Sequence, residues 1–209
     1  MKKVLVVSVG TAARNILDRC LEKAGDIDTL CIETHWTSFN RSNSMKKILI
    51  GVGIEIDIDG WKDTLGGRHT GGHPDWGEKA AKADLPQIKD SISGADYIIL
   101  VAGLGGGTGS GASPVIAESA NSMGIHVVSI VTTPFSFEGE KRRRISLECI
   151  EKLKETSDAL ITLDNNEILN ERFSLLDACK KSDDKCSDII LEKYKELKQE
   201  DRTNEVPLH

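Results

Sequence analysis

Two long apolar runs constrain the fold of this chain more than any other feature. Residues 97–102 read Tyr-Ile-Ile-Leu-Val-Ala, and residues 125–131 form a second, nearly continuous run. A strand that is apolar at every position is buried on both faces, as in a parallel sheet covered by helices. We therefore predict that residues 97–102 form a strand at the centre of such a sheet.

Extended and helical patterns alternate along the rest of the chain. Further strands are predicted at 3–8, 29–32 and 159–163, with one or two more within 48–58, and residues 60–72 are expected to form a loop. Helices are predicted at 12–23, from about 75 with a kink or division at Pro86, at 112–123, at 138–156 and at 182–200. This alternation predicts a doubly wound, mainly parallel α/β sheet with helices on both faces. We expect one domain over residues 1–200 and a flexible tail at 201–209.

Composition excludes several classes of protein. The 209 residues carry 27 Lys and Arg against 33 Asp and Glu, a net charge of −6, which argues against a general nucleic-acid binder. The sequence holds no apolar run of about 18 residues, so no membrane span is predicted. The five cysteines are odd in number and form no C-x-x-C pair, which predicts free, mostly buried thiols and a cytoplasmic location.

The segment 103–111, Gly-Leu-Gly-Gly-Gly-Thr-Gly-Ser-Gly, lies between a predicted strand and a predicted helix. Glycines let the backbone turn sharply and direct successive N–H groups into one concavity, and the helix adds its positive end. Such a turn binds phosphate; the alternative is a turn needed only for tight packing. The P-loop pattern fails because no lysine follows, and the dinucleotide pattern G-x-G-x-x-G fails at Thr108.

This segment resembles the signature loop of the tubulin superfamily, in the form G-G-G-T-G-[ST]-G found in FtsZ. Residues 73–81, 112–118, 131–142 and 174–178 resemble other FtsZ motifs; residues 131–142, for example, read Val-Thr-Thr-Pro-Phe-Ser-Phe-Glu-Gly-Glu-Lys-Arg. The resemblance covers about residues 3–199. It implies the Rossmann-like nucleotide-binding domain of FtsZ and tubulin, and therefore a site for GTP or GDP with Mg²⁺ carried by the nucleotide.

The resemblance also assigns residues to this site. Asp183 would accept hydrogen bonds from guanine N1–H and the exocyclic amine, a donor pair that adenine lacks, and Thr108 and Ser110 would donate hydroxyl hydrogen bonds to phosphate. No catalytic residue and no metal ligand is assigned. The complete nucleotide-binding set is Gly10, Thr11, Ala12, Asn15, Gly71, Gly72, Gly105, Gly106, Gly107, Thr108, Gly109, Ser110, Gly111, Pro134, Glu138, Arg142, Asn165 and Asp183.

Several positions depart from the family pattern. Residues 9–15 read V-G-T-A-A-R-N where FtsZ reads V-G-G-G-G-G-N, so side chains crowd the phosphate while Arg14 adds a charge, and affinity could move either way. His35 replaces an acidic residue near the metal site, and Cys179 replaces a phenylalanine that commonly stacks on guanine. The acidic N-x-D-x-x-D loop that follows the central helix of the family has no counterpart at 201–205.

These observations support one leading hypothesis and two alternatives. The chain is expected to be a GTP-binding protein with weak or partner-dependent GTPase activity, linked to a cytoskeletal filament or to cell division. The first alternative is a regulator without enzymatic activity that caps or modulates a filament-forming homologue, and self-association is a further option. The second alternative is a different small nucleotide or dinucleotide bound on the same scaffold.

Overall fold

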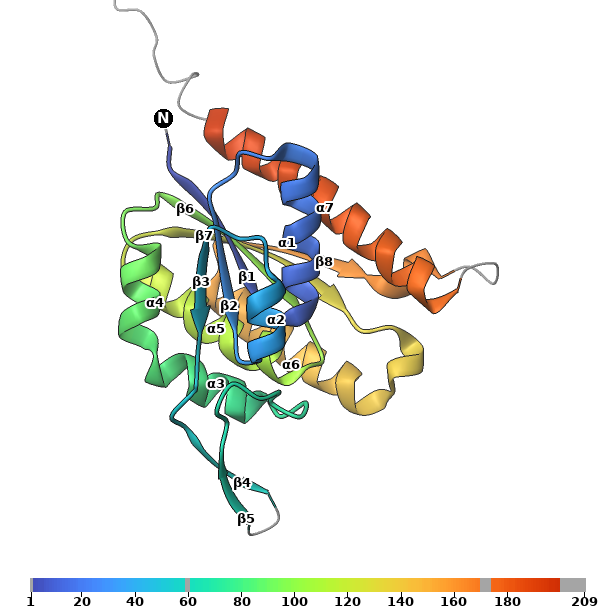
Figure 1. Cartoon of the computed structure of the whole chain (residues 1–209). Helices are drawn as coiled ribbons and strands as arrows, with labels where there is room; N and C mark the ends of the chain where they lie inside the picture. The colour runs from blue at the N-terminus through green and yellow to red at the C-terminus, as the bar shows by residue number, and fades with distance from the viewer. Residues whose placement is uncertain (1, 59–60, 170–173, 200–209) are drawn as a thin grey trace, which may run out of the picture.

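Six parallel strands form the central sheet of the computed structural model, which describes residues 2–58, 61–169 and 174–199 (Figure 1). The strand order is β3-β2-β1-β6-β7-β8, and every adjacent pair is parallel. The strands are β1 (Val4–Val9), β2 (Thr29–Glu33), β3 (Lys46–Leu49), β6 (Tyr97–Gly103), β7 (His126–Thr133) and β8 (Ala159–Asp164). The predicted doubly wound α/β fold is confirmed, with β6 beside β1 at the centre.

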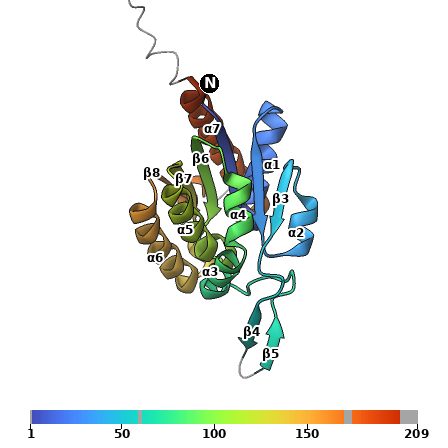
Figure 2. The ribbon, with the colours of Figure 1, turned by 90° about the vertical axis from the view of Figure 1, so that its left-hand side faces the viewer.

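Helices cover both faces of this sheet (Figure 2). One face carries α3 (Pro74–Ala83), α4 (Leu85–Ile92), α5 (Gly107–Ser122) and α6 (Glu140–Thr156), and the other carries α1 (Thr11–Ala24) and α7 (Leu175–Gln199). The short helix α2 (Trp36–Arg41) contacts β2 and β3, and two 3₁₀ turns span Ser136–Glu138 (η1) and Asn165–Ile168 (η2).

The apolar core follows the alternation of the central strands. In β6, Ile98 and Leu100 face the α3–α6 side, whereas Ile99 faces α1 and α7. All three side chains are completely buried. Because both sets of alternating positions are covered, the strand needs apolar residues throughout, and this is the pattern from which the fold was predicted.

A β-hairpin corrects the prediction that residues 60–72 are entirely loop. β4 (Glu55–Ile58) pairs with β5 (Trp61–Thr64) in a separate antiparallel sheet, which projects from the body of the protein (Figure 1). Its base is anchored by Leu65, which is fully buried, and by Ile56, which is 6% exposed. The strand β5 was not predicted because its sequence, Trp-Lys-Asp-Thr, holds too few apolar residues to show an alternation of apolar and polar side chains.

Some helix ends differ from the predicted ones, and α2 was not predicted. Helix α5 begins at Gly107 instead of 112, and α7 begins at Leu175 instead of 182. The predicted division at Pro86 is confirmed, since α4 is separate from α3 and carries Pro86 in its first turn. The predicted tail at 201–209 lies outside the described residues.

Within the described part of the chain, no helix is both long enough and apolar enough to cross a membrane. The five cysteines are free thiols, and four of them are buried while Cys179 is half-buried. Burial raises the pKa of the Cys149 thiol to about 11, so this side chain behaves as a small apolar group in the core.

Candidate functional site

The carboxyl ends of β1 and β6 mark the point where the strand order reverses. The chain passes from β1 to β2 on one side and from β6 to β7 on the other. Crevices at such reversal points are the usual ligand sites of open α/β sheets. The end of β6 and the start of α1, the helix that follows β1, approach closely here, since a Cβ atom added to Gly103 would lie 2.5 Å from the Cβ atom of Ala12.

The glycine-rich loop after β6 is held in a bend by a hydrogen bond from its own helix. Gly105 has φ +94°, which favours glycine, and its N–H donates to Ser110 Oγ over 2.8 Å. The N–H of Leu104 donates to the carbonyl of Thr132 over 2.9 Å. The bend therefore has a fixed shape within the protein itself.

Two further glycines are required by packing between segments. A Cβ atom on Gly107 would lie 2.2 Å from Thr70 Oγ1, and one on Gly111 would lie 2.0 Å from the carbonyl oxygen of Pro74. The glycines thus let α5 pack directly against α3 and the loop that precedes it. They bring the positive N-terminal end of α5 to the crevice.

Three threonines connect the loops around this helix end. Thr108 Oγ1 lies 2.7 Å from Thr34 Oγ1 and 3.4 Å from Thr70 Oγ1. Thr34 and Thr70 are buried, whereas Thr108 is partly exposed. The first turn of α5 is therefore tied to the loops that follow β2 and β5.

Two cavities lie at this edge of the sheet. The larger has a volume of about 530 Å³ and is lined by the loops after β1, β5, β6 and β7. The smaller has a volume of about 310 Å³ and is lined by α1, α7 and the segment around η1. They share five lining residues and therefore adjoin, namely Ala12, Asn15, Thr132, Glu138 and Asn165.

Most residues of the predicted nucleotide-binding set line these cavities. The larger cavity contains Thr11, Ala12, Asn15, Gly71, Gly72, Gly106, Gly107, Thr108, Pro134, Glu138, Arg142 and Asn165. Asp183 lines the smaller cavity. The structure thus brings together residues that lie up to about 170 positions apart in the sequence.

The other members of the set do not line either cavity. These residues are buried within the loops and helix starts around the cavities: Gly10, Gly105, Gly109, Ser110 and Gly111. Ser110 is 4% exposed and its hydroxyl accepts from Gly105, so it supports the bend instead of facing the crevice. Arg14 also lines neither cavity, because its guanidinium donates to Asp18 Oδ2 over 2.8 Å.

Glu138 organises the segment that joins the two cavities. One carboxylate oxygen, Oε1, accepts from the backbone N–H of Phe135 over 2.9 Å, and Oε2 accepts from Arg142 Nη1 over 2.6 Å. Both oxygens are therefore engaged within the protein. Arg142 remains half-exposed on the rim of the larger cavity.

The smaller cavity holds a carboxyl group in a poorly solvated position. Burial raises the pKa of Asp183 to about 6, while Arg19 and Arg14 act in the opposite direction. Asn165 lies nearby in the same cavity, where its Oδ1 accepts from Ser182 Oγ over 2.5 Å. At neutral pH the Asp183 carboxylate is charged and can accept hydrogen bonds from a ligand.

Two histidines stack beside the larger cavity. The rings of His35 and His69 have centroids 3.4 Å apart, and His69 lines the cavity. Burial, and secondarily the neighbouring His69, lowers the pKa of His35, so His35 is neutral at neutral pH. In the described ranges, no three His, Cys, Asp or Glu residues are grouped closely enough to hold a metal ion.

The predicted set omitted some lining residues. Thr132 and Thr133 are the last two residues of β7, and Phe137 lies in η1 with 55% of its surface exposed. Their position at the end of a buried strand is the signal that would have found the threonines, because the carboxyl ends of parallel strands share one edge. The ring of Phe137 stacks on Phe135 with centroids 5.0 Å apart.

Comparison with known proteins identifies the family. The model of the Tubulin/FtsZ family, GTPase domain, matches residues 3–172. The chain belongs to the tubulin/FtsZ family. An empty FtsZ dimer from M. jannaschii shares 33% identity at a TM-score of 0.82, over 91% of this chain and 53% of that one.

More distant tubulin/FtsZ structures share the fold. CetZ2 of Haloferax volcanii, solved as a protofilament bound to GTPγS, has a TM-score of 0.77 and 21% identity, over 91% of this chain and 57% of that one. TubZ of Clostridium botulinum phage c-st has a TM-score of 0.69 and 19% identity, over 92% and 59%. The present chain therefore spans a little over half the length of these tubulin/FtsZ relatives.

Proposed function

We propose that this chain binds GTP and GDP across the two adjoining cavities. The observation that carries the proposal is the placement of the α5 N-terminus beside the larger cavity, with the half-buried Asp183 in the smaller one. Backbone N–H groups at a helix start attract phosphate oxygens. The phosphates would then lie against Gly106, Gly107 and Thr108, with Arg142 on the rim.

The smaller cavity would take the guanine base. The Asp183 carboxylate can accept from N1–H and the exocyclic amine, and Asn165 adds an amide within the same cavity. Cys179 lines this cavity and offers a poor stacking surface, but the exposed ring of Phe137 lies in it too. We propose that Phe137 supplies the aromatic contact to the base.

Mg²⁺ would be held mainly by the phosphates of the nucleotide. Magnesium prefers oxygen ligands, whereas His35 offers only ring nitrogens and Glu138 already accepts two hydrogen bonds within the protein. The chain therefore offers the cation mainly neutral hydroxyl and amide oxygens on the cavity wall, such as those of Thr11, Thr108 and Asn15.

Hydrolysis by these 209 residues alone would be slow. Among the described residues, Glu138 and Asp183 are the acidic side chains that line the cavities. Glu138 has both oxygens engaged, and Asp183 lies at the base end, away from the α5 N-terminus. An attacking water would have no positioned base, so we propose that turnover depends on a partner.

Titration with GTP, GDP and ATP in the presence of Mg²⁺ tests the proposal. Isothermal calorimetry should show GTP and GDP binding at least about tenfold more tightly than ATP, because only guanine offers the donor pair that Asp183 accepts. Phosphate release should stay close to background at every protein concentration. Equal affinity for ATP and GTP would refute the guanine assignment, and rapid turnover would refute the partner dependence.

A second candidate function is the capping or modulation of a filament-forming homologue, or self-association. Exposed apolar side chains at the smaller cavity favour it, since Phe137 and Leu175 line the cavity and are 55% and 58% exposed, and the next residue, Leu176, is 63% exposed. Such surfaces mark interaction sites. Under this proposal the protein acts in the cytoplasm on a filament, for example in cell division. Sedimentation velocity with GTP and with GDP tests self-association, and a single monomeric species in both would exclude it.

A further inference from the structure

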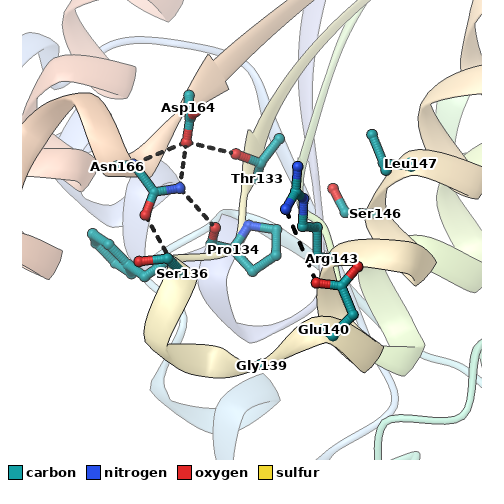
Figure 3. Close-up of a pocket in the computed structure, with 11 residues that line it drawn as sticks. Thr133, Pro134, Ser136, Gly139, Glu140, Arg143, Ser146, Leu147, Asp164 and Asn166 are labelled. Carbon is teal, nitrogen blue, oxygen red and sulfur yellow. Dashed lines mark hydrogen bonds and ion pairs between the residues drawn. The ribbon is translucent and has the colours of Figure 1, made fainter.

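A third cavity, of about 400 Å³, lies at the ends of β7 and β8 beside the first two turns of α6 (Figure 3). It shares Thr133 and Pro134 with the larger nucleotide-side cavity and Phe135 with the smaller one. None of the residues assigned to nucleotide binding other than Pro134 lines it. The cavity therefore calls for an explanation of its own.

A buried hydroxyl group on its wall has no hydrogen-bond partner. Ser146 is 1% exposed, and among the described residues nothing bonds to its Oγ. The hydroxyl of a serine inside a helix usually either points to solvent or donates to the carbonyl one turn earlier. A buried polar atom left unsatisfied is costly and therefore rare. Its place on the cavity wall indicates that the partner is a ligand atom.

Backbone and side-chain donors gather at the same place, beside the carboxylates of Glu140 and Asp164. The cavity includes Gly139 and Glu140, where α6 begins, so the unpaired N–H groups of the first helical turn lie beside it. Figure 3 shows Arg143 and Ser146 facing one space from α6. Arg143 is 72% exposed and only loosely held, because Glu140 is 4.0 Å away.

One oxygen of the acidic group on the opposite wall already accepts three hydrogen bonds within the protein. Asp164 Oδ1 accepts from the backbone N–H of Asn166 over 2.9 Å, from Asn166 Nδ2 over 2.8 Å and from Thr133 Oγ1 over 3.2 Å (Figure 3). These bonds, that of the backbone N–H first, lower the pKa of Asp164. The cavity therefore keeps Arg143 and Ser146 as donors toward a ligand.

Part of the remaining wall is apolar. Pro134 and Phe135 form part of it, and Leu147 adds an aliphatic side chain that is 54% exposed. We propose that this cavity binds a small planar carboxylic acid, with the carboxylate on Arg143 and the Ser146 hydroxyl and the ring against Pro134 and Leu147. This proposal does not rest on nucleotide binding, because the two sites share only the connecting segment.

Benzoate is the probe that tests the site, with acetate and benzyl alcohol as matched fragments. Saturation-transfer NMR on the full chain should show benzoate binding, and each fragment should bind at least about fivefold more weakly because it lacks either the ring or the charge. Absence of saturation transfer to benzoate overturns the proposal. Acetate that binds as well as benzoate also overturns it, since the apolar wall would then play no part.

Two variants assign the contacts. Arg143→Ala and Ser146→Ala should each weaken benzoate binding by about tenfold or more, the size expected for one lost hydrogen bond to a charged group. Arg144→Ala is the matched control, because Arg144 is equally exposed, pairs with Glu148 and does not line the cavity. Equal effects of Arg143→Ala and Arg144→Ala would indicate nonspecific attraction and refute the site.

A stability measurement guards against loss of folding. Ser146→Ala removes an unsatisfied buried oxygen, so the ligand-free variant should melt at the same temperature as the wild type or higher. Weaker benzoate binding with an unchanged or raised melting temperature supports a ligand role for the hydroxyl. A lowered melting temperature with unchanged benzoate affinity would assign Ser146 to folding alone and overturn the proposal.

Discussion

The hydroxyl oxygens of Thr34 and Thr108 lie 2.7 Å apart, although 74 positions separate the two residues in the sequence. Thr34 follows β2 and is completely buried, whereas Thr108 lies in the first turn of α5 and lines the larger cavity. This hydrogen bond fixes the start of α5 against the sheet. It should therefore affect both stability and nucleotide binding, and the two effects can be separated.

Thr108→Val removes the hydroxyl and keeps the shape of the side chain. We expect the free energy of unfolding to fall by about 1–3 kcal/mol, because Thr34 is left buried without a partner. Nucleotide affinity should fall by about tenfold, since Thr108 also faces the ligand. The double variant Thr34→Val/Thr108→Val should regain much of the stability and none of the affinity. Urea unfolding and calorimetry measure the two quantities. Equal affinities of Thr34→Val and Thr108→Val would contradict a direct ligand contact.

Gly107→Ala should disrupt the site through the loop that precedes α3. The new Cβ atom would lie 2.2 Å from Thr70 Oγ1 and 2.7 Å from the carbonyl oxygen of His73, so this loop must move. We expect nucleotide affinity to fall by at least about a hundredfold and stability by about 1–3 kcal/mol, as for overpacking. Gly53→Ala is the control, because a Cβ atom there meets nothing within 4 Å. Unchanged affinity in Gly107→Ala would mean that this loop plays no part in binding.

Much of the fold could be predicted because the central strands are buried on both faces. The composition of a strand such as β6 indicates that it lies at the centre of the sheet, because Ile98 and Ile99 face opposite helix layers and both must be apolar. The hairpin was not predictable in the same way. β5 reads Trp-Lys-Asp-Thr, and its stability depends on pairing with β4 and on the burial of Leu65 beside it.

The sequence predicted most of the chosen residues that line the two cavities, but not what each of them does there. A glycine that faces a ligand and one that makes room for a neighbouring backbone look alike in sequence, and Gly106 and Gly111 are such a pair. Ser110 shows the same limit. Its hydroxyl oxygen accepts a hydrogen bond from the N–H of Gly105, and this contact depends on a bend that has no local sequence signal.

Ser110→Ala tests that structural role. The N–H of Gly105 would lose its acceptor in a buried position, so the free energy of unfolding should fall by about 1–3 kcal/mol. Nucleotide dissociation should accelerate because the bend is no longer held. Ser122→Ala is the control on the same helix, since its hydroxyl bonds to the carbonyl of Ser119 at the far end. A variant as stable as the wild type, with weaker binding, would instead place Ser110 in contact with the ligand.

The raised pKa of Asp183 predicts a pH dependence with opposite signs for binding and folding. Burial raises this pKa to about 6, so the carboxylate is charged above pH 6 and protonated below it. GTP affinity should therefore fall as the pH drops below 6, by up to about tenfold per pH unit, because the protonated acid loses an acceptor for guanine.

The stability of the ligand-free protein should change in the opposite direction and rise as the pH drops. A folded pKa above the unfolded one means that this group stabilises the fold as the pH falls from 6 toward 4. Asp183→Asn should remove both dependences, weaken GTP binding at pH 7 and raise the melting temperature there. Calorimetry and thermal unfolding between pH 5 and pH 8 measure them, and a GTP affinity that falls with pH equally in wild type and Asp183→Asn would show that another group is responsible.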